Sequence, residues 1–489
     1  MREQFVLRVR DYQSIGLYAY ELDLKDLEHW RENYAIVAED TGLLKATNRI
    51  GITEARKRNG EKVTLRVVPR FKNLDPLKML EELTRDEEFL TYAEQGEEPL
   101  YRIFADHPPV KAPSRGDGEA LSAISFVMRL YNLCRKQLKP QMTQWEENMN
   151  GKVKGRIVFK THLQKNVLRG MEHRVYCRYS LNTVDNPENR ILKAALRQAR
   201  KILQKFFRHQ RQGGGALAAR IAYCQHALRD VSERKITARD FAAVRTSGYY
   251  AYYKPVLSLA KHLLTRSFAG VREEDSGIET EVVPYCIDMQ KLFEVYIYSK
   301  LKELSGTRLS DPASEWEYEV ELLNRPYGRK YPLTHAGGKG SGDKPFIEAD
   351  ERMSGSSAAQ PPALHIQGNV CPDFYLAISR KRKGEDAVAE RKTVVLDAKY
   401  KHAEMQNRSD TLQIFAYAYI FDADATGFVF PLENRPDHLA GKIRDKPDQR
   451  YFELVLSIGT SEPAGERAER HDVEGFVRFM IRQLFSPAP

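Results

Sequence analysis

Apolar and polar residues alternate with a period of two in the first part of the chain, which is the spacing of half-buried strands. The alternation is clear over residues 5–10 and again over residues 63–68. Between them lies Asn59-Gly60, a pair that commonly closes β-hairpins. We therefore expect residues 1–110 to form a β-rich domain, and we assign it partner docking as a hypothesis.

Apolar residues change to a helical spacing in residues 111–275, so this region is expected to be mostly helical. Residues 121–133 have the spacing of one buried helix face, and the pattern stops before Pro140. Residues 106–118 carry the prolines and glycines of a linker, and residues 151–159 predict one short extended segment. A helical region of this kind is a candidate surface for DNA or for a partner.

Two helix starts carry clear capping signals. Asp75-Pro76 predicts a short helix over residues 77–83, because proline is well tolerated at the first helical position. Asn186 predicts a second start as the N-cap, followed by Pro187 at the first position. Glu188 then lies in the first turn, where the helix dipole favours a negative charge.

Two groups of side chains in the helical region allow more than one interpretation. The helix after Pro187 has a basic side, which would contact a nucleic-acid backbone or simply face water, and we favour the second. Four tyrosines near residue 250 would stack on bases or pack inside, and we assign them to the core. The Gly- and Ser-rich stretch 331–362 is expected to be a loop, and residues 337–344 lack the spacing of a phosphate-binding loop. The basic side of the helix consists of Lys193, Arg197, Arg200, Lys201, Lys205 and Arg208, and the four tyrosines are Tyr249, Tyr250, Tyr252 and Tyr253.

The composition is that of a globular chain with a moderate excess of positive charge. The 489 residues include 77 lysines and arginines against 67 acidic residues, for a net charge of +10. This excess suits a polyanionic partner such as DNA. The five cysteines are widely spaced and never form Cys-x-x-Cys, which argues against a zinc site or a disulfide framework. With no apolar run long enough for a signal or a membrane helix, we expect a cytoplasmic protein without a membrane partner.

Candidate chemistry lies in the C-terminal part, at the ends of two predicted strands. Apolar runs that begin near residues 369 and 393 flank a charged stretch, 379–392, which we interpret as the loop between two neighbouring strands. In the second run Asp397 and Lys399 point to the same face, about 7 Å apart. Lone charges at such positions are costly when buried, so they favour a bound metal ion and an anion. The alternative is a pair of hairpin salt bridges, since Asp-x-Lys is a common pattern.

This residue set suits phosphodiester cleavage. Such a reaction needs a divalent metal to activate water and a cation to stabilise developing charge. Mg²⁺ prefers one or two carboxylates together with water and phosphate oxygens. Asp373 and Asp397 would supply the carboxylates, and the carbonyl of Ala398 could add a ligand. Lys399 would orient or deprotonate the water and contact the phosphate.

Two flanking helices add further candidates. Asp288 predicts the cap of a helix that stops near Gly306, and Glu294 is the only charge between residues 292 and 298 of that helix. It either serves the site or lies at the edge of an amphipathic stripe. Gln413 lies four residues before Tyr417 and on the same helical face. Its alternative role is structural, because Asp410 and Gln413 have the spacing of a capping box.

The order of these elements resembles the PD-(D/E)XK nuclease superfamily. A helix glutamate precedes Pro372-Asp373, then come Asp397-Ala-Lys399 and a Gln-x-x-x-Tyr helix. Segments beginning at Leu292, Asp185 and Gly427 make the chain similar to the McrC nuclease subunits of McrBC-type restriction systems. The resemblance implies an α/β (α+β overall) fold, with a mixed central sheet flanked by helices in residues 276–489.

The same resemblance implies a function. It suggests a Mg²⁺-dependent DNA endonuclease, with Mn²⁺ as a substitute ion, that works in anti-phage restriction. Asp373 and Asp397 would bind metal, Lys399 would act in catalysis, and Glu294 and Gln413 would support the site. The family works with a separate AAA+ GTPase motor, and this sequence contains no Walker motif. A homodimer through the nuclease domain, a stand-alone repair or recombination nuclease, and a non-catalytic DNA-binding scaffold stay open.

Overall fold

The computed structural model describes most of the chain and divides it into two compact units. The first unit joins Met1–Arg102 to Cys286–Pro489, and the second is Ile103–Tyr285. The three-domain division expected from the sequence stays a prediction. The described residues are 6–16, 36–38, 43–89, 93, 99–104, 107, 110–112, 117–209, 215–268, 280–310, 314–323, 331–332, 369–385, 387–432, 437–443, 446–458 and 472–485. The predicted loop over residues 331–362 lies outside them except for Tyr331–Pro332.

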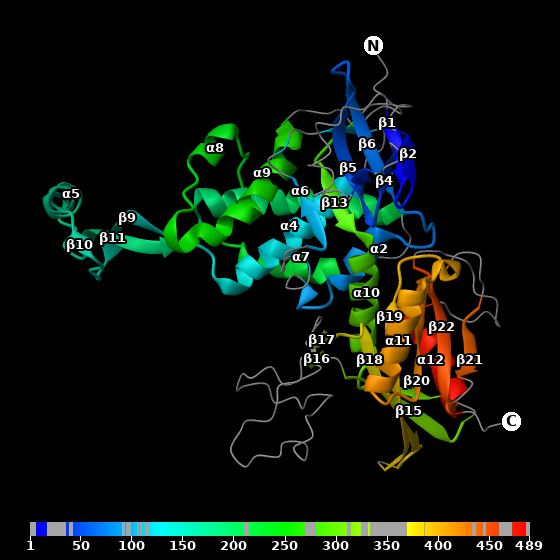
Figure 1. Cartoon of the computed structure of the whole chain (residues 1–489). Helices are drawn as coiled ribbons and strands as arrows, with labels where there is room; N and C mark the ends of the chain where they lie inside the picture. The colour runs from blue at the N-terminus through cyan, green and yellow to red at the C-terminus, as the bar shows by residue number, and fades with distance from the viewer. Residues whose placement is uncertain are drawn as a thin grey trace, which may run out of the picture. The chain divides into compact units, whose positions relative to one another are not determined.

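The N-terminal part of the first unit is a sheet, as its alternating pattern predicts (Figure 1). The strand order is β1-β6-β5-β13-β7, with β1 parallel to β6 and β5 antiparallel to it. The predicted hairpin joins β5 to β6, and Gly60 has a φ of 82° in its turn. The strands are β1 (Val6–Arg10), β5 (Arg49–Arg56), β6 (Lys62–Val68), β7 (Tyr101–Ile103) and β13 (Tyr285–Asp288), beside a small sheet of β2 (Ser14–Gly16), β4 (Leu43–Ala46) and β3 (Ile36–Ala38).

Helix α2 (Pro76–Leu83) follows this sheet and begins as the sequence predicts. The Asp75 side chain accepts hydrogen bonds from the backbone N–H groups of Leu77 and Lys78, which satisfies two of the free donors of the first turn. Helix α10 (Met289–Leu304) also belongs to this unit, and Asp288 caps it by accepting from the Lys291 N–H. The predicted helix start at Asp75-Pro76 and the predicted Asp288 cap are both confirmed.

The C-terminal part of the first unit is a mixed seven-stranded sheet. Its order is β14-β15-β18-β19-β20-β22-β21, and the pairs β19–β20 and β20–β22 are parallel while the others are antiparallel. The mixed α/β architecture with several sheets agrees with the expected fold class. The elements are β14 (Arg308–Ser310), β15 (Trp316–Leu322), β18 (Phe374–Arg382), β19 (Val388–Ala398), α11 (Arg408–Ile420), β20 (Ala425–Pro431), β21 (Leu439–Ile443), β22 (Lys446–Leu456) and α12 (Val473–Phe485).

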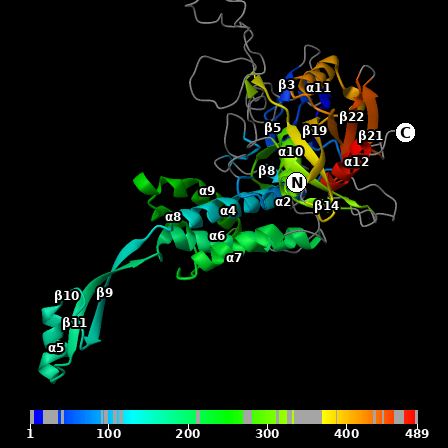
Figure 2. The same ribbon diagram turned by 90° about the horizontal axis from the view of Figure 1, so that it is seen from below.

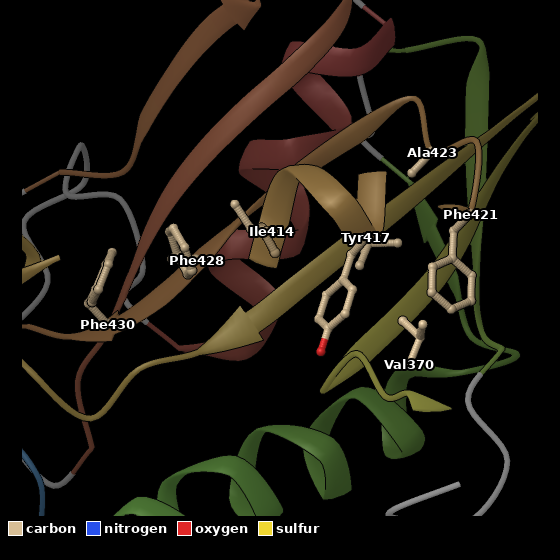
Figure 3. Close-up of a cluster of buried hydrophobic side chains, with 8 residues drawn as sticks. Val370, Ile414, Tyr417, Phe421, Ala423, Phe428 and Phe430 are labelled. Carbon is tan, nitrogen blue, oxygen red and sulfur yellow. The ribbon is translucent and has the colours of Figure 1, made fainter. Parts of the chain in front are cut away.

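Helices cover both faces of this sheet. On one face α11 packs over β19 and β20, where Ile414 and Tyr417 meet Val395 and Phe428 in a buried cluster (Figure 3). On the other face α12 packs on β22, with the Phe452 and Phe479 rings 6.2 Å apart. Because both faces are covered, the central strands are near-continuous apolar runs rather than alternating ones.

The charged stretch 379–392 is not the loop that the sequence suggested. Strand β18 continues to Arg382 and β19 begins at Val388, so only residues 383–387 connect them. The polar strand ends are held together by cross-strand ion pairs, such as Arg380 with Glu390 at 2.9 Å. Charged side chains are compatible with strands that extend beyond the buried part of a sheet, and for this reason the charge pattern misplaced the strand ends.

The second unit is built mainly on packed helices, as its periodicity predicts (Figure 2). Asn186 caps α6 by accepting from the Asn189 N–H at 2.9 Å, and its amide also donates to the Lys139 carbonyl at 2.6 Å. The expected linker 106–118 contains a short strand, β8, paired with β12. The elements are β8 (Val110–Ala112), α4 (Asp117–Lys136), α6 (Pro187–His209), α7 (Gly215–Ala227), α8 (Ala238–Ala242), α9 (Lys254–Phe268) and β12 (Thr280–Val282).

The sequence predicted only one short extended segment, 151–159, of a three-stranded antiparallel arm within this unit. The arm consists of β9 (Gln141–Asn150), β10 (Arg156–Ile157) and β11 (Arg174–Thr183), with α5 (Phe159–Lys165) beside them (Figure 2). Strand β9 is largely exposed, and its sequence QMTQWEENMN has no apolar alternation. A strand that buries neither face has no reason to alternate apolar and polar residues, so its sequence does not show the pattern by which strands are predicted.

The two ambiguous side-chain groups of this unit have mixed outcomes. Part of the basic side of α6 binds the chain that follows α7, since Lys193 Nζ donates to the Val231 carbonyl at 2.6 Å. Tyr253 is fully buried and its hydroxyl donates to Asn189 Oδ1 at 3.0 Å, as expected for core. Tyr249, however, is 77% exposed, so its assignment to the core is wrong. Among the helices of the described residues, none is long and apolar enough to cross a membrane.

Candidate active site

The register of β18 against β19 brings the two predicted carboxylates face to face. Phe374 pairs with Leu396 and Tyr375 with Val395, so the next step of the same antiparallel register places Asp373 opposite Asp397. The Asp373 Oδ2 accepts a hydrogen bond from the Ala398 N–H at 2.7 Å, which fastens it to the end of β19. Side chains directly opposite in such a pair have Cβ atoms roughly 5 Å apart. The two carboxyl groups therefore share one small site.

Lys399 lies directly after β19 and on the same side as Asp397. Its Nζ is 2.5 Å from Asp397 Oδ2, which confirms the shared face that the alternation predicted. Its backbone N–H donates to the Val429 carbonyl of β20 at 2.9 Å, so the residue is still held by the sheet. Asp397 is only 3% exposed. The ion pair therefore lies in a place that water reaches poorly.

Helix α11 brings the next candidate to Lys399. The Lys399 Nζ donates to Gln413 Oε1 at 3.5 Å, Gln413 Nε2 donates to the Tyr417 hydroxyl at 2.8 Å, and that hydroxyl donates to the Cys371 carbonyl at 3.2 Å. In Figure 3 the Tyr417 hydroxyl points away from α11, toward the strand segment that carries Val370. This chain of hydrogen bonds ends two residues before Asp373.

The structural alternative for Gln413 is wrong. The capping box of α11 is formed by Asn407, whose side chain accepts from the Asp410 N–H at 2.8 Å, and by Asp410, which accepts from the Asn407 N–H at 3.1 Å. The helix therefore begins three residues earlier than the proposed Asp410–Gln413 box requires. Gln413 lies inside the helix with its amide free to face Lys399.

Asp410 is a site residue that the sequence reasoning assigned only to capping. Its Oδ1 lies 3.7 Å from Lys399 Nζ, and its Oδ2 forms an ion pair with Lys401. Desolvation opposes its charge, but the Lys401 ammonium and the Asn407 N–H outweigh this and lower the pKa of Asp410. The position three residues before Gln413, on the same helical side, was the signal available for it.

The electrostatics of the site favour a cation. Burial raises the pKa of Asp373 well above its usual range, and the negative charges of Glu294 and Asp397 raise it further. Burial also raises the pKa of Asp397, although Lys399 opposes this effect. For Lys399, desolvation lowers the pKa, but the neighbouring Asp397 outweighs it and the net shift is upward. Carboxylates that are costly to ionise together are stabilised by a bound positive charge.

The donor set suits Mg²⁺ better than a metal held entirely by protein. In the described part of the chain, no three His, Cys, Asp or Glu side chains are grouped as a metal site. Asp373 and Asp397 nevertheless place two carboxylates together at the end of β19, beside the backbone of Ala398. Mg²⁺ usually takes one or two carboxylates and completes its shell with water and phosphate oxygens.

Most of the predicted site residues thus come together. Contacts join Asp373, Asp397, Lys399 and Gln413 through adjacent strands and α11. Glu294, from α10, acts on Asp373 through its charge. Their catalytic and metal-binding roles stay predictions.

Comparison with known proteins adds a family. The sequence matches the family model described as McrBC 5-methylcytosine restriction system component over residues 44–322, which is more than half of the chain. The match includes Glu294 and ends before Asp373, so it does not bear on the carboxylate pair. No curated protein matches the sequence.

Two solved structures are similar at a low level. The first is a refined half-complex from a tetradecameric assembly of Thermococcus gammatolerans McrB AAA+ hexamers with bound McrC. It has a TM-score of 0.40 and 15% identity, and covers 98% of this chain and 100% of that one. The second, a cryo-EM structure of the Thermococcus gammatolerans McrBC complex, has a TM-score of 0.29 and 14% identity, and covers 61% of this chain and 87% of that one. The family assignment therefore rests on the sequence match.

Proposed function

The chain belongs to the McrBC 5-methylcytosine restriction system component family, and we propose that it is the DNA-cleaving subunit of such a system. Its substrate would be the phosphodiester backbone of DNA, and its C-terminal sheet would be a PD-(D/E)XK nuclease core. The observation that carries the proposal is the pairing of Asp373 with Asp397, beside a lysine 2.5 Å from Asp397 Oδ2. Two neighbouring carboxylates and a cation are the groups that metal-assisted hydrolysis of a phosphodiester requires.

Each residue has a distinct role in this proposal. Asp373 and Asp397, with the Ala398 carbonyl, would hold Mg²⁺, or Mn²⁺ in its place. A bound metal ion would lower the pKa of the attacking water and polarise the phosphate. Lys399 would orient that water and stabilise the negative charge that develops on the phosphate oxygens. Its ammonium is held for this task between Asp397 on one side and Gln413 on the other.

Glu294 and Gln413 would support the centre without changing its chemistry. Glu294 adds negative charge next to Asp373, which strengthens the attraction for a cation. Gln413 accepts a hydrogen bond from Lys399 and donates one to Tyr417, and so limits the rotamers of the lysine. Removing either side chain would weaken cleavage less than removing Asp397.

A motor subunit is the expected partner. Restriction-system components act together, and the McrC chain of Thermococcus gammatolerans is bound to McrB AAA+ hexamers. By analogy, we propose a separate AAA+ GTPase that delivers DNA to this chain. The net charge of +10 favours DNA as a ligand of this chain. Exposed apolar side chains on the arm, such as Phe159 of α5 at 75% and Met142 of β9 at 72% exposure, suit contact with a protein partner.

Plasmid cleavage in Mg²⁺ tests the proposal. Asp397→Ala and Lys399→Ala should each lower the cleavage rate roughly a hundred- to a thousandfold, because each removes a charge that acts on the transition state. Folding and DNA binding should be kept. Lys392→Ala, near the middle of β19 and five residues before Asp397, is the matched control and should cleave like the parent chain. Cleavage by either site variant at the parental rate would refute the catalytic assignment.

The same assay tests the motor. Cleavage should require an AAA+ GTPase of the McrB type from the same genome, together with GTP. Rapid cleavage by the purified chain alone would contradict the motor-dependent proposal and leave a self-sufficient nuclease.

A further inference from the structure

Tyr400, the residue directly after Lys399, is held by segments from far along the chain. The Lys401 N–H donates to the Lys399 carbonyl at 2.8 Å, which closes a three-residue turn around Tyr400. The Tyr400 side chain is 3% exposed and its ring lies 5.1 Å from Phe71, edge to face. A second ring, Phe293 of α10, lies 6.2 Å away. The turn that follows the candidate catalytic lysine is therefore packed inside the first unit.

Arg70 reaches this turn from the N-terminal sheet. It follows β6, and its Nη2 donates a hydrogen bond to the backbone carbonyl of Tyr400. The guanidinium lies between aromatic rings, with its carbon 4.2 Å from the centre of Tyr12, 4.7 Å from Phe71 and 5.2 Å from Tyr400. These rings leave Arg70 few alternative positions. One side chain thus connects the end of β6 to the backbone next to Lys399.

The backbone of Arg70 is also held in place by hydrogen bonds. Its backbone N–H donates to Asp11 Oδ1 at 2.5 Å, and the Asp11 N–H donates to the Val68 carbonyl at 3.0 Å. Tyr12 has a φ of 60°, a left-handed conformation that a residue with a side chain adopts at an energetic cost. Such strain persists only where the surroundings impose it, and it is concentrated at functional sites. Here the strained residue supplies the ring nearest to the guanidinium.

A purely structural role explains Arg70 poorly. Its Nε is buried and has no hydrogen-bond partner within the described residues. Burying a guanidinium with an unsatisfied donor is costly, and an apolar side chain would pack against three rings without that cost. What an apolar side chain lacks is a charged donor for the Tyr400 carbonyl. A cationic side chain therefore provides two features that an apolar one lacks, a favourable charge near Asp11 and control of the backbone after Lys399.

We infer that Arg70 is a positioning residue for Lys399, through the Tyr400 carbonyl, and so makes the nuclease centre depend on the N-terminal sheet. The inference rests on the proposed function, since it gives Lys399 a role in cleavage. The geometry has a direct consequence. A shift of the backbone in the Asp11–Tyr12 turn or at the end of β6 would move Arg70, and through Arg70 the backbone next to Lys399. This coupling does not involve α11 or the central strands.

Arg70→Met tests the inference, because methionine keeps much of the packing volume and loses the donor. Hydrogen–deuterium exchange of the peptide that covers residues 396–403 should become roughly tenfold faster or more, as expected for loss of a charge-assisted hydrogen bond. In the plasmid assay kcat should fall roughly ten- to a hundredfold with KM for DNA unchanged, as expected for a misplaced catalytic group. Arg70→Lys, which retains a charged donor, should restore most of both properties.

Two further variants make the test decisive. Arg8→Met, at an exposed position on the neighbouring strand β1, is the control and should change neither readout. Tyr12→Ala removes a partly exposed ring from the guanidinium, and should shift both readouts in the same direction as Arg70→Met but less. It replaces Arg70→Met if that variant does not fold.

The outcomes separate this inference from the proposed function. Unchanged exchange over residues 396–403 in Arg70→Met, or an equal change in Arg8→Met, would overturn the positioning role. Faster exchange with parental kcat would overturn it as well. If the parent chain and Asp397→Ala cleave equally, the proposed function fails, and with it the claim that Arg70 positions a catalytic group. A lower kcat together with faster exchange, both restored by lysine, would support the inference.

Discussion

The pH dependence of stability offers a quantitative test of the contact that Asp11 makes between the N-terminal sheet and Tyr400 in the C-terminal part of the chain. Burial raises the pKa of this carboxyl from 3.8 to about 6, and the opposing effects of Arg70 and the Tyr400 hydroxyl are smaller. In the unfolded chain the pKa returns to its ordinary value. The folded state therefore binds more protons than the unfolded state between about pH 4 and pH 6.

The sign and size of the effect follow from this difference. Because the folded-state pKa is the higher one, the contribution of Asp11 to stability is fully present below about pH 4 and is lost as the pH rises through about 6. A shift of about two pKa units corresponds to about 3 kcal/mol. Asp11→Asn carries no charge at any pH and keeps an oxygen that can accept from the Arg70 N–H. The stability of this variant relative to the parent chain should therefore increase by about 2 kcal/mol from pH 4 to pH 6.5, because part of the titration lies outside this range.

Urea unfolding at a series of pH values measures this difference. A Trp145→Phe background leaves tryptophans only at positions 30 and 316, both within the first unit, so fluorescence reports on the unit that contains Asp11. Asp448→Asn, at an exposed position on β22, is the matched control and should give a curve parallel to that of the background. Parallel curves for Asp11→Asn and the background across this range would refute the reasoning, whatever their constant offset.

Two further predictions concern the packing of each unit. Gly427→Ala would place a Cβ 2.2 Å from the Phe452 carbonyl oxygen between β20 and β22, and should destabilise the first unit by about 1–3 kcal/mol in urea unfolding. Gly441→Ala in the same sheet meets nothing within 4 Å and should change stability by less than about 0.5 kcal/mol. In the second unit, Asn186→Ala should destabilise by about 1–2 kcal/mol, because it removes the α6 cap and the bond to the Lys139 carbonyl. An unchanged melting temperature of α-helical circular dichroism in that variant would contradict the capping role.

The sequence predicted the local features of the fold well, because their causes are local. Asn186 and Asp288 each cap the helix that they were expected to cap, since a short polar side chain before a helical run has few other uses. The helix expected after Asp75 begins at Pro76, as predicted. The two alternating N-terminal runs form strands for the same reason. Most of the exposed arm was missed because neither face of β9 is buried, so nothing in its sequence had to alternate.

The candidate site was predictable in its members but not in its geometry. Alternation alone placed Asp397 and Lys399 on one face, and their ion pair bears this out. The register that sets Asp373 opposite Asp397 depends on where β18 and β19 end, and the charged residues between them concealed those ends. For Gln413 the deciding fact was the cap at Asn407, which lies outside the Asp410–Gln413 spacing that had made a capping role plausible.

Lys399 shows why the remaining features could not come from pattern reasoning. Its ammonium contacts Asp397 two residues away, but also Asp410 and Gln413 of the next helix. Its backbone is bonded to β20, and the carbonyl that follows it is held by Arg70, which lies 330 positions from Tyr400 in the sequence. Periodicity reports only on neighbours within a few residues, so it can nominate a lysine but not the groups that orient it. If those groups determine whether Lys399 can act, the variants that discriminate best between a nuclease and an inert scaffold include residues that no local motif contains.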